Sequence, residues 1–260
     1  MSSTSLSRPE VPGRAEIAAN RRRAGGLALL PAFVVFVVVA VIVGALVSVV
    51  VGIIVGVVAG LLVALGVWRS GPAVVFRLTG ARVAGFDEQP RVHNLIDGLC
   101  AASGVPKPTL RVVDDDTPNA MTVGLHPRRA TIVITTGLVS ALGRIELEAV
   151  LAHEVSHVKV HDILPGTVAV TALGPVAALF PPAGGLPSRG AGRTREALAD
   201  LAGVALTRYP PGLISALEKV GSDSRAAGQR RRARDRAVDH LWIFGQTRAL
   251  DERLLALREL

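Results

Sequence analysis

Residues 25–68 contain no charged side chain, and this run constrains the fold more than any other feature of the sequence. As one helix the run would be about 66 Å long, whereas the hydrocarbon core of a bilayer is about 30 Å thick. Two membrane spans, at about 27–45 and 49–67 with a turn near Gly44 to Ser48, account for its length. A secretory signal peptide has a much shorter apolar core, so the sequence predicts a transmembrane hairpin over 25–69.

Arginines flank the apolar run on both sides, at residues 21–23 and at Arg69, Arg77 and Arg82. Positive charge favours the cytoplasmic side of a membrane, so both ends of the hairpin and the domain that follows are expected in the cytoplasm. The net charge of +8 could instead indicate nucleic acid, but no aromatic residues interleave with the arginine clusters. We therefore expect an anionic bilayer, and no nucleic acid, as the partner of this charge.

Composition supports a membrane protein without a disulfide framework. Half of the residues are hydrophobic but 3% are aromatic, a bias towards Val, Ala, Leu and Gly that is typical of membrane helices. Cys100 is the only cysteine, so no intrachain disulfide can form, which is compatible with a reducing compartment. Residues 1–24 are polar and basic and predict a disordered tail.

Residues 70–260 predict one mainly helical domain with a small β-sheet, and the fold class is therefore α+β. Strands are expected at 110–113, 120–125 and 130–135, with helices at about 86–104, 144–163, 194–209, 212–221 and 250–260. His126 to Arg129 predict a hairpin connection between the last two strands. Residues 163–187 are apolar but broken by prolines and too short for two spans. We expect a re-entrant, surface-lying or packed element there, close to the membrane.

The stretch LAHEVSH at residues 151–157 carries the most specific chemistry in the chain. His153 and His157 lie four apart, so on a helix both imidazoles can face one point about 2 Å from each nitrogen, as Zn²⁺ requires. Glu154, beside the first histidine, can take a proton from a water that the metal has made more acidic. Because the pattern is loose, a polar helix face without metal stays open on this motif alone.

A third ligand is expected from REALADLAG at residues 195–203. Glu196 and Asp200 again lie four apart, so Glu196 can complete a tripod while Asp200 accepts a hydrogen bond from a ligand imidazole. Their apolar neighbours indicate a buried helix, where two carboxylates without a cation would be costly. His161 is less suitable, because three histidines on one helix face span about 12 Å. We interpret His161 as a surface residue or a neighbour of a ligand, and Asp162 as a solvated or capping charge.

Several ordered motifs together resemble the HtpX-like membrane zinc metalloproteases, gluzincins related to the CAAX prenyl endopeptidases. The resemblance covers most of residues 27–260 and rests on the hairpin and on PNAMTVG, ATIVITTGLVSAL, LEAVLAHEVSH, EALAD and LDERLLALREL. It implies that His153, His157 and Glu196 bind one Zn²⁺ and that Glu154 is the catalytic base. Asn119 and Ala120 match the family's Asn-Ala element beside the active site. The strand from Ala130 to Thr135 would be the edge strand that pairs with an extended peptide.

The C-terminal region departs from the family pattern. Relatives usually carry Thr-His-Pro before a Glu-Arg pair, and its histidine is thought to help the oxyanion. Here the stretch reads QTRALDER, with Arg248 in place of that histidine, while Arg253 matches the arginine of the pair. An arginine can still stabilise an oxyanion. His240 is a further candidate, although it better matches a histidine before a Leu-Phe-Ile-like element in relatives.

These observations predict a membrane-anchored, cytoplasm-facing zinc endopeptidase that hydrolyses peptide bonds. By resemblance its substrates are membrane or misfolded proteins, which indicates membrane protein quality control. The alternative is a zinc-binding pseudoprotease that acts as a membrane scaffold or regulator, which Arg248 favours and the intact Glu154 opposes. The sequence predicts neither the oligomeric state nor the natural substrate.

Overall fold

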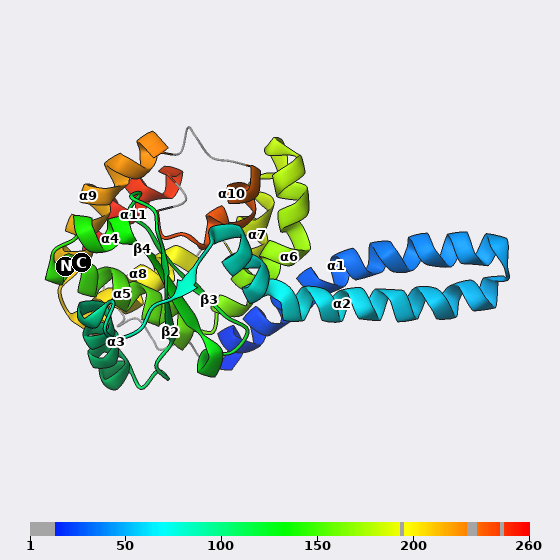
Figure 1. Ribbon diagram of the computed structural model, residues 1–260, viewed down its shortest axis with the longest axis horizontal. Helices are drawn as coiled ribbons and strands as arrows, with labels where there is room; N and C mark the ends of the chain where they lie inside the picture. Colours follow the sequence, from blue (N-terminus) through cyan, green and yellow to red (C-terminus); the bar gives the residue numbers. More distant parts are fainter. Residues whose placement is uncertain (1–13, 193–194, 228–232, 245–246) are drawn as a thin grey trace, which may run out of the picture.

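The computed structural model describes residues 14–192, 195–227, 233–244 and 247–260. Two long antiparallel helices, α1 (Arg14–Leu46) and α2 (Val49–Thr79), extend as a hairpin from a globular domain (Figure 1). Both are long and apolar enough to cross a membrane. The turn lies at Val47 and Ser48, and the Ser48 hydroxyl accepts a hydrogen bond from Val51 N at 3.3 Å. The predicted hairpin is therefore present, with helices longer than the predicted spans.

The predicted tail over 1–24 is wrong for residues 14–24, which form the first turns of α1. Ala24 packs with Leu164 and Val168, and the Asn20 amide donates to Val160 O at 3.3 Å. These contacts with the domain hold the basic segment in a helix. Residues 1–13 lie outside the described part of the chain.

The hairpin is held by a row of small residues on one face of α2. Gly52, Gly56 and Gly60 are spaced four apart and are buried. A Cβ atom on Gly56 would lie 2.9 Å from Phe36 O, and one on Gly60 would lie 3.0 Å from Ala32 O. Glycine therefore allows the two backbones to approach closely, as is common between membrane helices.

The sheet has four strands in the order β1-β2-β4-β3. They are β1 (Arg82–Val83), β2 (Thr109–Val113), β3 (Ala120–Val123) and β4 (Thr131–Thr135). Strand β4 pairs parallel to β2 on one side and antiparallel to β3 on the other. The expectation that residues 130–135 form an edge strand is therefore wrong, and β3 is the edge on that side. The 3₁₀ turn Pro127–Arg129 joins β3 to β4, which confirms the predicted hairpin connection.

Helices cover both faces of the sheet. On one face Leu110, Ile132 and Ile134 pack with α3 (Pro90–Ser103) and α5 (Arg144–Lys159). On the other, Met121 and Val133 pack with the end of α2 and with α6 (Ile163–Leu179). The remaining helices surround α5 and α6: α4 (Thr136–Ala141), α7 (Leu186–Ala191), α8 (Arg195–Thr207), α9 (Pro210–Ala227), α10 (Ala233–Val238) and α11 (Thr247–Arg258), with 3₁₀ turns at Pro181–Ala183 and Asp239–Leu241.

The apolar segment after α5 is a packed helix rather than a broken one. Pro165 lies in the first turn of α6, where a missing N–H costs nothing, and the helix continues through Pro175. Residues 163–170 are buried, and the Thr171 hydroxyl donates to Val67 O of α2 at 2.8 Å. Helix α6 is bent by 83° from α5. Helix α6 therefore connects the end of α5, which carries His153 and His157, with the base of the hairpin.

Candidate metal centre

Two crossing helices, α5 and α8, bring the candidate ligands together. Helix α5 lies between the sheet and α8 and is almost wholly buried from Leu147 to Val158. Helix α8 approaches α5 closely at Gly203, where a Cβ atom would lie 2.9 Å from the N atom and 3.0 Å from the Cα atom of His153. Glycine at this position therefore sets the spacing of the two helices at the site.

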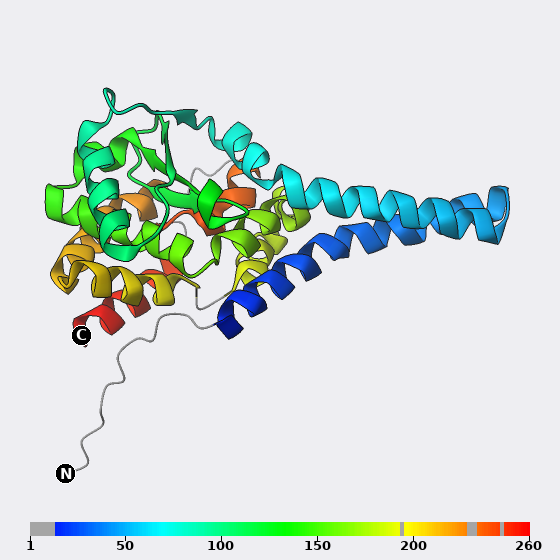
Figure 2. The same ribbon diagram turned by 90° about the horizontal axis from the view of Figure 1, so that it is seen from below.

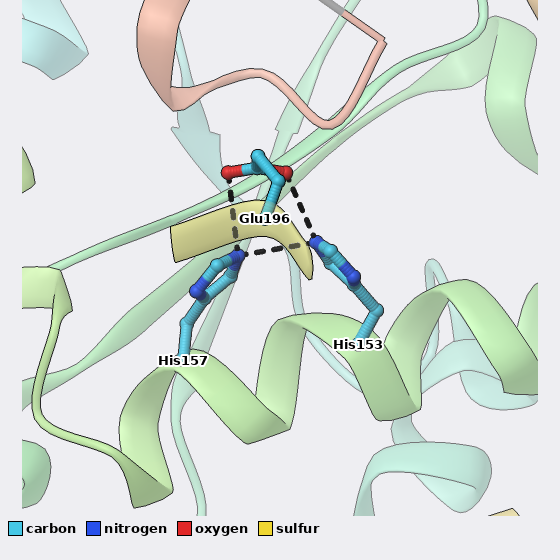
Figure 3. A group of neighbouring side chains, drawn as sticks. All are labelled: His153, His157 and Glu196. Atoms are coloured by element: carbon cyan, nitrogen blue, oxygen red, sulfur yellow. Dashed lines mark hydrogen bonds and ion pairs between the residues drawn. The ribbon is translucent and has the colours of Figure 1, made fainter. Parts of the chain in front are cut away.

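His153, His157 and Glu196 converge on one point between these helices (Figure 3). The Nε2 atoms of the two histidines are 3.1 Å apart. Glu196 lies with Oε2 3.4 Å from Nε2 of His153 and Oε1 3.8 Å from Nε2 of His157. Ligand atoms bound tetrahedrally about 2 Å from one Zn²⁺ are about 3.3 Å apart, so the observed separations fit such an ion.

The chemistry of these groups also fits a cation. The Nδ1 atoms of His153 and His157 lie 2.8 Å from Asp200 Oδ1 and 3.0 Å from Asp162 Oδ1. Each Nδ1 is therefore placed to carry the ring proton, which leaves two Nε2 lone pairs facing each other. Among the described residues Glu196 Oε2 is buried without a hydrogen-bond donor. A metal ion would satisfy all three acceptors at once.

Burial and charge favour the ligand forms at two of the three residues. Burial, and then the charge of Arg195, keeps the pKa of His157 well below its usual value, so this imidazole is neutral. Burial raises the pKa of Glu196, but the close approach of His153 and the Arg195 charge outweigh it and hold that pKa far below its usual range. Burial lowers the pKa of His153, but Asp200 and Glu196 outweigh it and raise that pKa to about 9. Without a metal, His153 would therefore be protonated on both ring nitrogens at neutral pH.

Glu154 is fully buried on α5 beside the first histidine. The Thr122 hydroxyl of β3 donates to Glu154 Oε2 at 2.6 Å, while Oε1 has no partner among the described residues. Burial raises the pKa of Glu154 to about 7. A carboxylate with one free oxygen and a pKa near neutrality is suited to accept and return a proton.

A buried network of charged side chains surrounds the three candidate ligands. Arg253 of α11 forms two hydrogen bonds to Asp200, from Nε at 2.6 Å and from Nη2 at 2.7 Å. It also donates from Nη1 to Ile243 O at 2.8 Å. Arg195 lies 3.2 Å from Glu196 Oε1 and 3.5 Å from Asp162 Oδ1. Asp200 thus lies directly beside the candidate ligand His153, and Arg253 is bonded to Asp200.

The remaining predicted residues lie around the centre in different ways. Asn119 Oδ1 accepts from Ala120 N at 3.1 Å and from Phe244 N at 3.2 Å, so the Asn-Ala element joins β3 to the segment after the 3₁₀ turn Asp239–Leu241. His240 is buried with Nε2 2.9 Å from Gly166 O, and burial lowers its pKa to about 4. A neutral imidazole bonded to α6 is a poor source of positive charge for an oxyanion. The side chain of Arg248 lies outside the described residues.

The expectation for Asp162 was wrong, and three further contributors to the site were not expected from the sequence. Asp162 is buried, and both of its oxygens lie 3.0 Å from Nδ1 of His157, so it is neither solvated nor a side-chain cap. Thr122, Arg195 and Gly203 are the three contributors that the sequence analysis did not name as site residues. The sequence does offer a signal for Asp162, which lies five residues after the second histidine, and for Arg195, which directly precedes Glu196. His161 is partly buried in a left-handed turn with φ of 58° and does not face the tripod.

Comparisons with known proteins agree with this geometry. Peptidase family M48 matches residues 87–223, which include both site helices. A protease HtpX homolog of Dictyoglomus thermophilum is 30% identical over 239 residues, covering 80% of this chain and 79% of the relative. Those of Salinibacter ruber and Tropheryma whipplei (strain Twist) are 32% and 33% identical over 210 and 198 residues. They cover 70% and 64% of this chain, and 75% and 67% of the relatives.

The apolar hairpin, the mainly helical domain and the tripod of α5 and α8 define a metalloprotease of the membrane. The chain belongs to peptidase family M48 and is HtpX-like within it.

Proposed function

We propose that this chain is a zinc-dependent endopeptidase, with His153, His157 and Glu196 as the ligands of one Zn²⁺. The observation that carries this proposal is the convergence of the Nε2 atoms of His153 and His157 with a buried Glu196 oxygen that accepts no hydrogen bond from the described residues. Supporting it is Glu154, which is buried on α5, the helix that carries both histidines, and has one oxygen without a hydrogen-bond partner among the described residues. A purely structural metal site would not need such a base.

Bound zinc would polarise the scissile carbonyl and acidify a water at its open position. Glu154 takes the proton from the attacking water and passes it to the leaving amine. Thr122 fixes one oxygen of Glu154, so the other is free for this transfer. Asp162 and Asp200 keep the imidazoles in the tautomer that offers Nε2 to the metal.

An extended peptide would pair with β3, the edge strand beside the site. The bond from Thr135 N to Asn119 O shows which backbone groups face β4, so those of Ala120 and Thr122 face outward by alternation. Ala120 O accepts from Ile243 N at 2.9 Å, and Thr122 is fully buried. Entry of a peptide at this edge therefore requires the segment around Ile243, or α6, to move.

The proposed organisation is a transmembrane hairpin whose first helix begins with a basic segment, followed by a protease domain over 70–260. We place the domain in the cytoplasm because arginines occur at both ends of the hairpin. A protease beside a bilayer can act on membrane or misfolded proteins, so we propose quality control of membrane proteins as its role. Reaction of cysteines placed in the exposed segments of the domain with a membrane-impermeant maleimide in intact cells, and again after lysis, tests the orientation.

Zinc content and proteolysis of the detergent-purified full chain test the proposed function, with wild type beside Glu154→Gln. We expect one zinc per chain in both and cleavage of unfolded proteins by the wild type alone. Zinc in both without cleavage by either would instead support the pseudoprotease scaffold, with Arg248→His as the reverting variant. Absence of zinc from both would overturn the metal centre.

A further inference from the structure

A cavity lies on the side of α5 away from the sheet, between α5, α8, the end of α3 and the first turns of α1. Its volume is about 880 Å³, within the range of pockets that hold organic ligands. The proposed chemistry uses none of its open space. The cavity therefore needs an explanation of its own.

One wall of the cavity is a partly exposed apolar face of α8. Leu198, Leu201, Ala202 and Ala205 line it at helical spacing. Leu198 is 47% exposed, Ala205 is also exposed, and Leu201 and Ala202 are half-buried. Such a face in contact with water is unfavourable and is typical of a binding surface. Its occupant must therefore be largely apolar.

The rim of the cavity is basic. Arg23 from α1, Lys159 from the end of α5 and Arg208 from the end of α8 line it and are exposed, with Glu16 as the acidic exception. Three cations around an apolar cavity complement an anionic headgroup on an apolar chain. At the floor, Arg195 is 5% exposed, and its Nη2 atom has no hydrogen-bond partner among the described residues.

The position of the cavity supplies such a ligand. Arg23 stands two residues before the uncharged run that begins at Gly25, about 3 Å along the helix axis. Figure 2 shows the first turns of α1 against the globular domain before the hairpin extends away from it. Arg23, on the rim, therefore lies close to the level where phospholipid headgroups meet water.

We propose that this cavity binds an anionic phospholipid, with one acyl chain along α8 and the phosphate among Arg23, Lys159 and Arg208. The lipid would lie against Asp162 and Arg195, which contact His157 and Glu196 from behind. The proposed lipid site thus adjoins the candidate metal centre through Asp162 and Arg195. The proposal does not depend on that centre being catalytic.

Photocrosslinking tests the proposal on the full chain in nonionic detergent. Leu198→p-benzoyl-phenylalanine places the reactive group on the cavity wall, and the same change at Leu255, an exposed leucine of α11 (61%), is the matched control. Equal amounts of phosphatidylglycerol and phosphatidylcholine are added, and adducts are identified by intact mass. We expect a phosphatidylglycerol adduct at position 198 at least about fivefold stronger than the phosphatidylcholine adduct, and none of that selectivity at 255.

Two further variants locate the ligand. Replacing the three rim cations by glutamine (Arg23→Gln, Lys159→Gln, Arg208→Gln) should abolish the preference for phosphatidylglycerol. Ala205→Trp fills the apolar wall and should remove the adduct at 198 while leaving zinc content unchanged. Equal labelling by both lipids, an adduct insensitive to the rim charges, or no lipid adduct at all would overturn the proposal. Crosslinking of position 198 to residues 1–13 or to a second copy of the chain would also overturn it, because the face would then be covered by protein.

Discussion

Asp162 holds the imidazole of His157 from the side opposite Glu196, with both carboxylate oxygens 3.0 Å from Nδ1. Burial raises the pKa of Asp162 to about 7, while the Arg195 charge opposes this rise. Two contacts hold the Asp162 carboxylate beside His157: the short distance to Nδ1 and the ion pair with Arg195. This pairing fixes which nitrogen of His157 is available to a metal.

Asp162→Asn is expected to weaken zinc binding by about 10- to 100-fold while the protein stays folded. An amide is a weaker acceptor than a carboxylate, so the Nε2 lone pair of His157 becomes less basic and less well oriented. Competition with a fluorescent zinc chelator measures the change. Asp97→Asn, at an exposed aspartate paired with Lys107, is the control that should leave zinc affinity unaltered. Equal affinities in the two variants would contradict the assigned contact.

Gly203→Ala is expected to lower zinc affinity by about tenfold, because its Cβ would press against the His153 backbone and push α8 away from α5. The added methyl lies far from any ligand atom on its own helix, so the effect must pass through helix spacing. Gly98→Ala on α3 meets nothing within 4 Å and should be neutral or stabilising. A Gly203→Ala protein with wild-type zinc affinity would show that the helices tolerate a wider spacing.

Zinc binding is expected to release a proton and to weaken as the pH falls. In the metal-free site the pKa of His153 is raised to about 9, so at neutral pH zinc must displace a proton from this imidazole. The dissociation constant should therefore rise by about tenfold for each pH unit below 9. Calorimetric titration in buffers of different ionisation enthalpy measures the protons released. A dissociation constant independent of pH between 6 and 8 would rule out a protonated His153 in the metal-free protein.

Thr122→Val should reduce kcat by about tenfold or more with little change in KM or zinc content, because Glu154 loses the hydroxyl that holds Oε2 at 2.6 Å. Thr122→Ser restores the hydroxyl and should recover most of the activity. Steady-state kinetics on a fluorogenic peptide separates kcat from KM. If serine and valine were equally impaired, the role of Thr122 would be packing rather than orientation.

The parts of the fold that depend on local pattern were predictable from the sequence. An uncharged run twice the length of one span specifies a hairpin, and two histidines four apart on a helix must share a face. The same spacing places Glu196 and Asp200 on one face of α8, where Glu196 lies near both Nε2 atoms and Asp200 lies near Nδ1 of His153.

The rest depends on contacts between distant segments. Asp162 looked solvated because a helix continued past His157 would turn it away, but α5 ends at Lys159 and the left-handed His161 turns the chain back. The family resemblance implied an edge strand at 130–135. The parallel pairing with β2 that makes this strand interior joins residues about twenty apart, which no local pattern reveals. Helix formation over 14–24 relies on packing against α6, which the basic composition of the segment does not reveal.

X-ray absorption at the zinc edge of the full chain, wild type beside Glu196→Gln, tests the central claim most directly. We expect one zinc per wild-type chain, bound by two imidazole nitrogens and by carboxylate or water oxygens at about 2.0–2.2 Å. We also expect loss of a carboxylate ligand and at least about 100-fold weaker binding in Glu196→Gln. Zinc with no imidazole in its first shell, or an unchanged spectrum and affinity in the variant, would contradict a metal centre built from His153, His157 and Glu196.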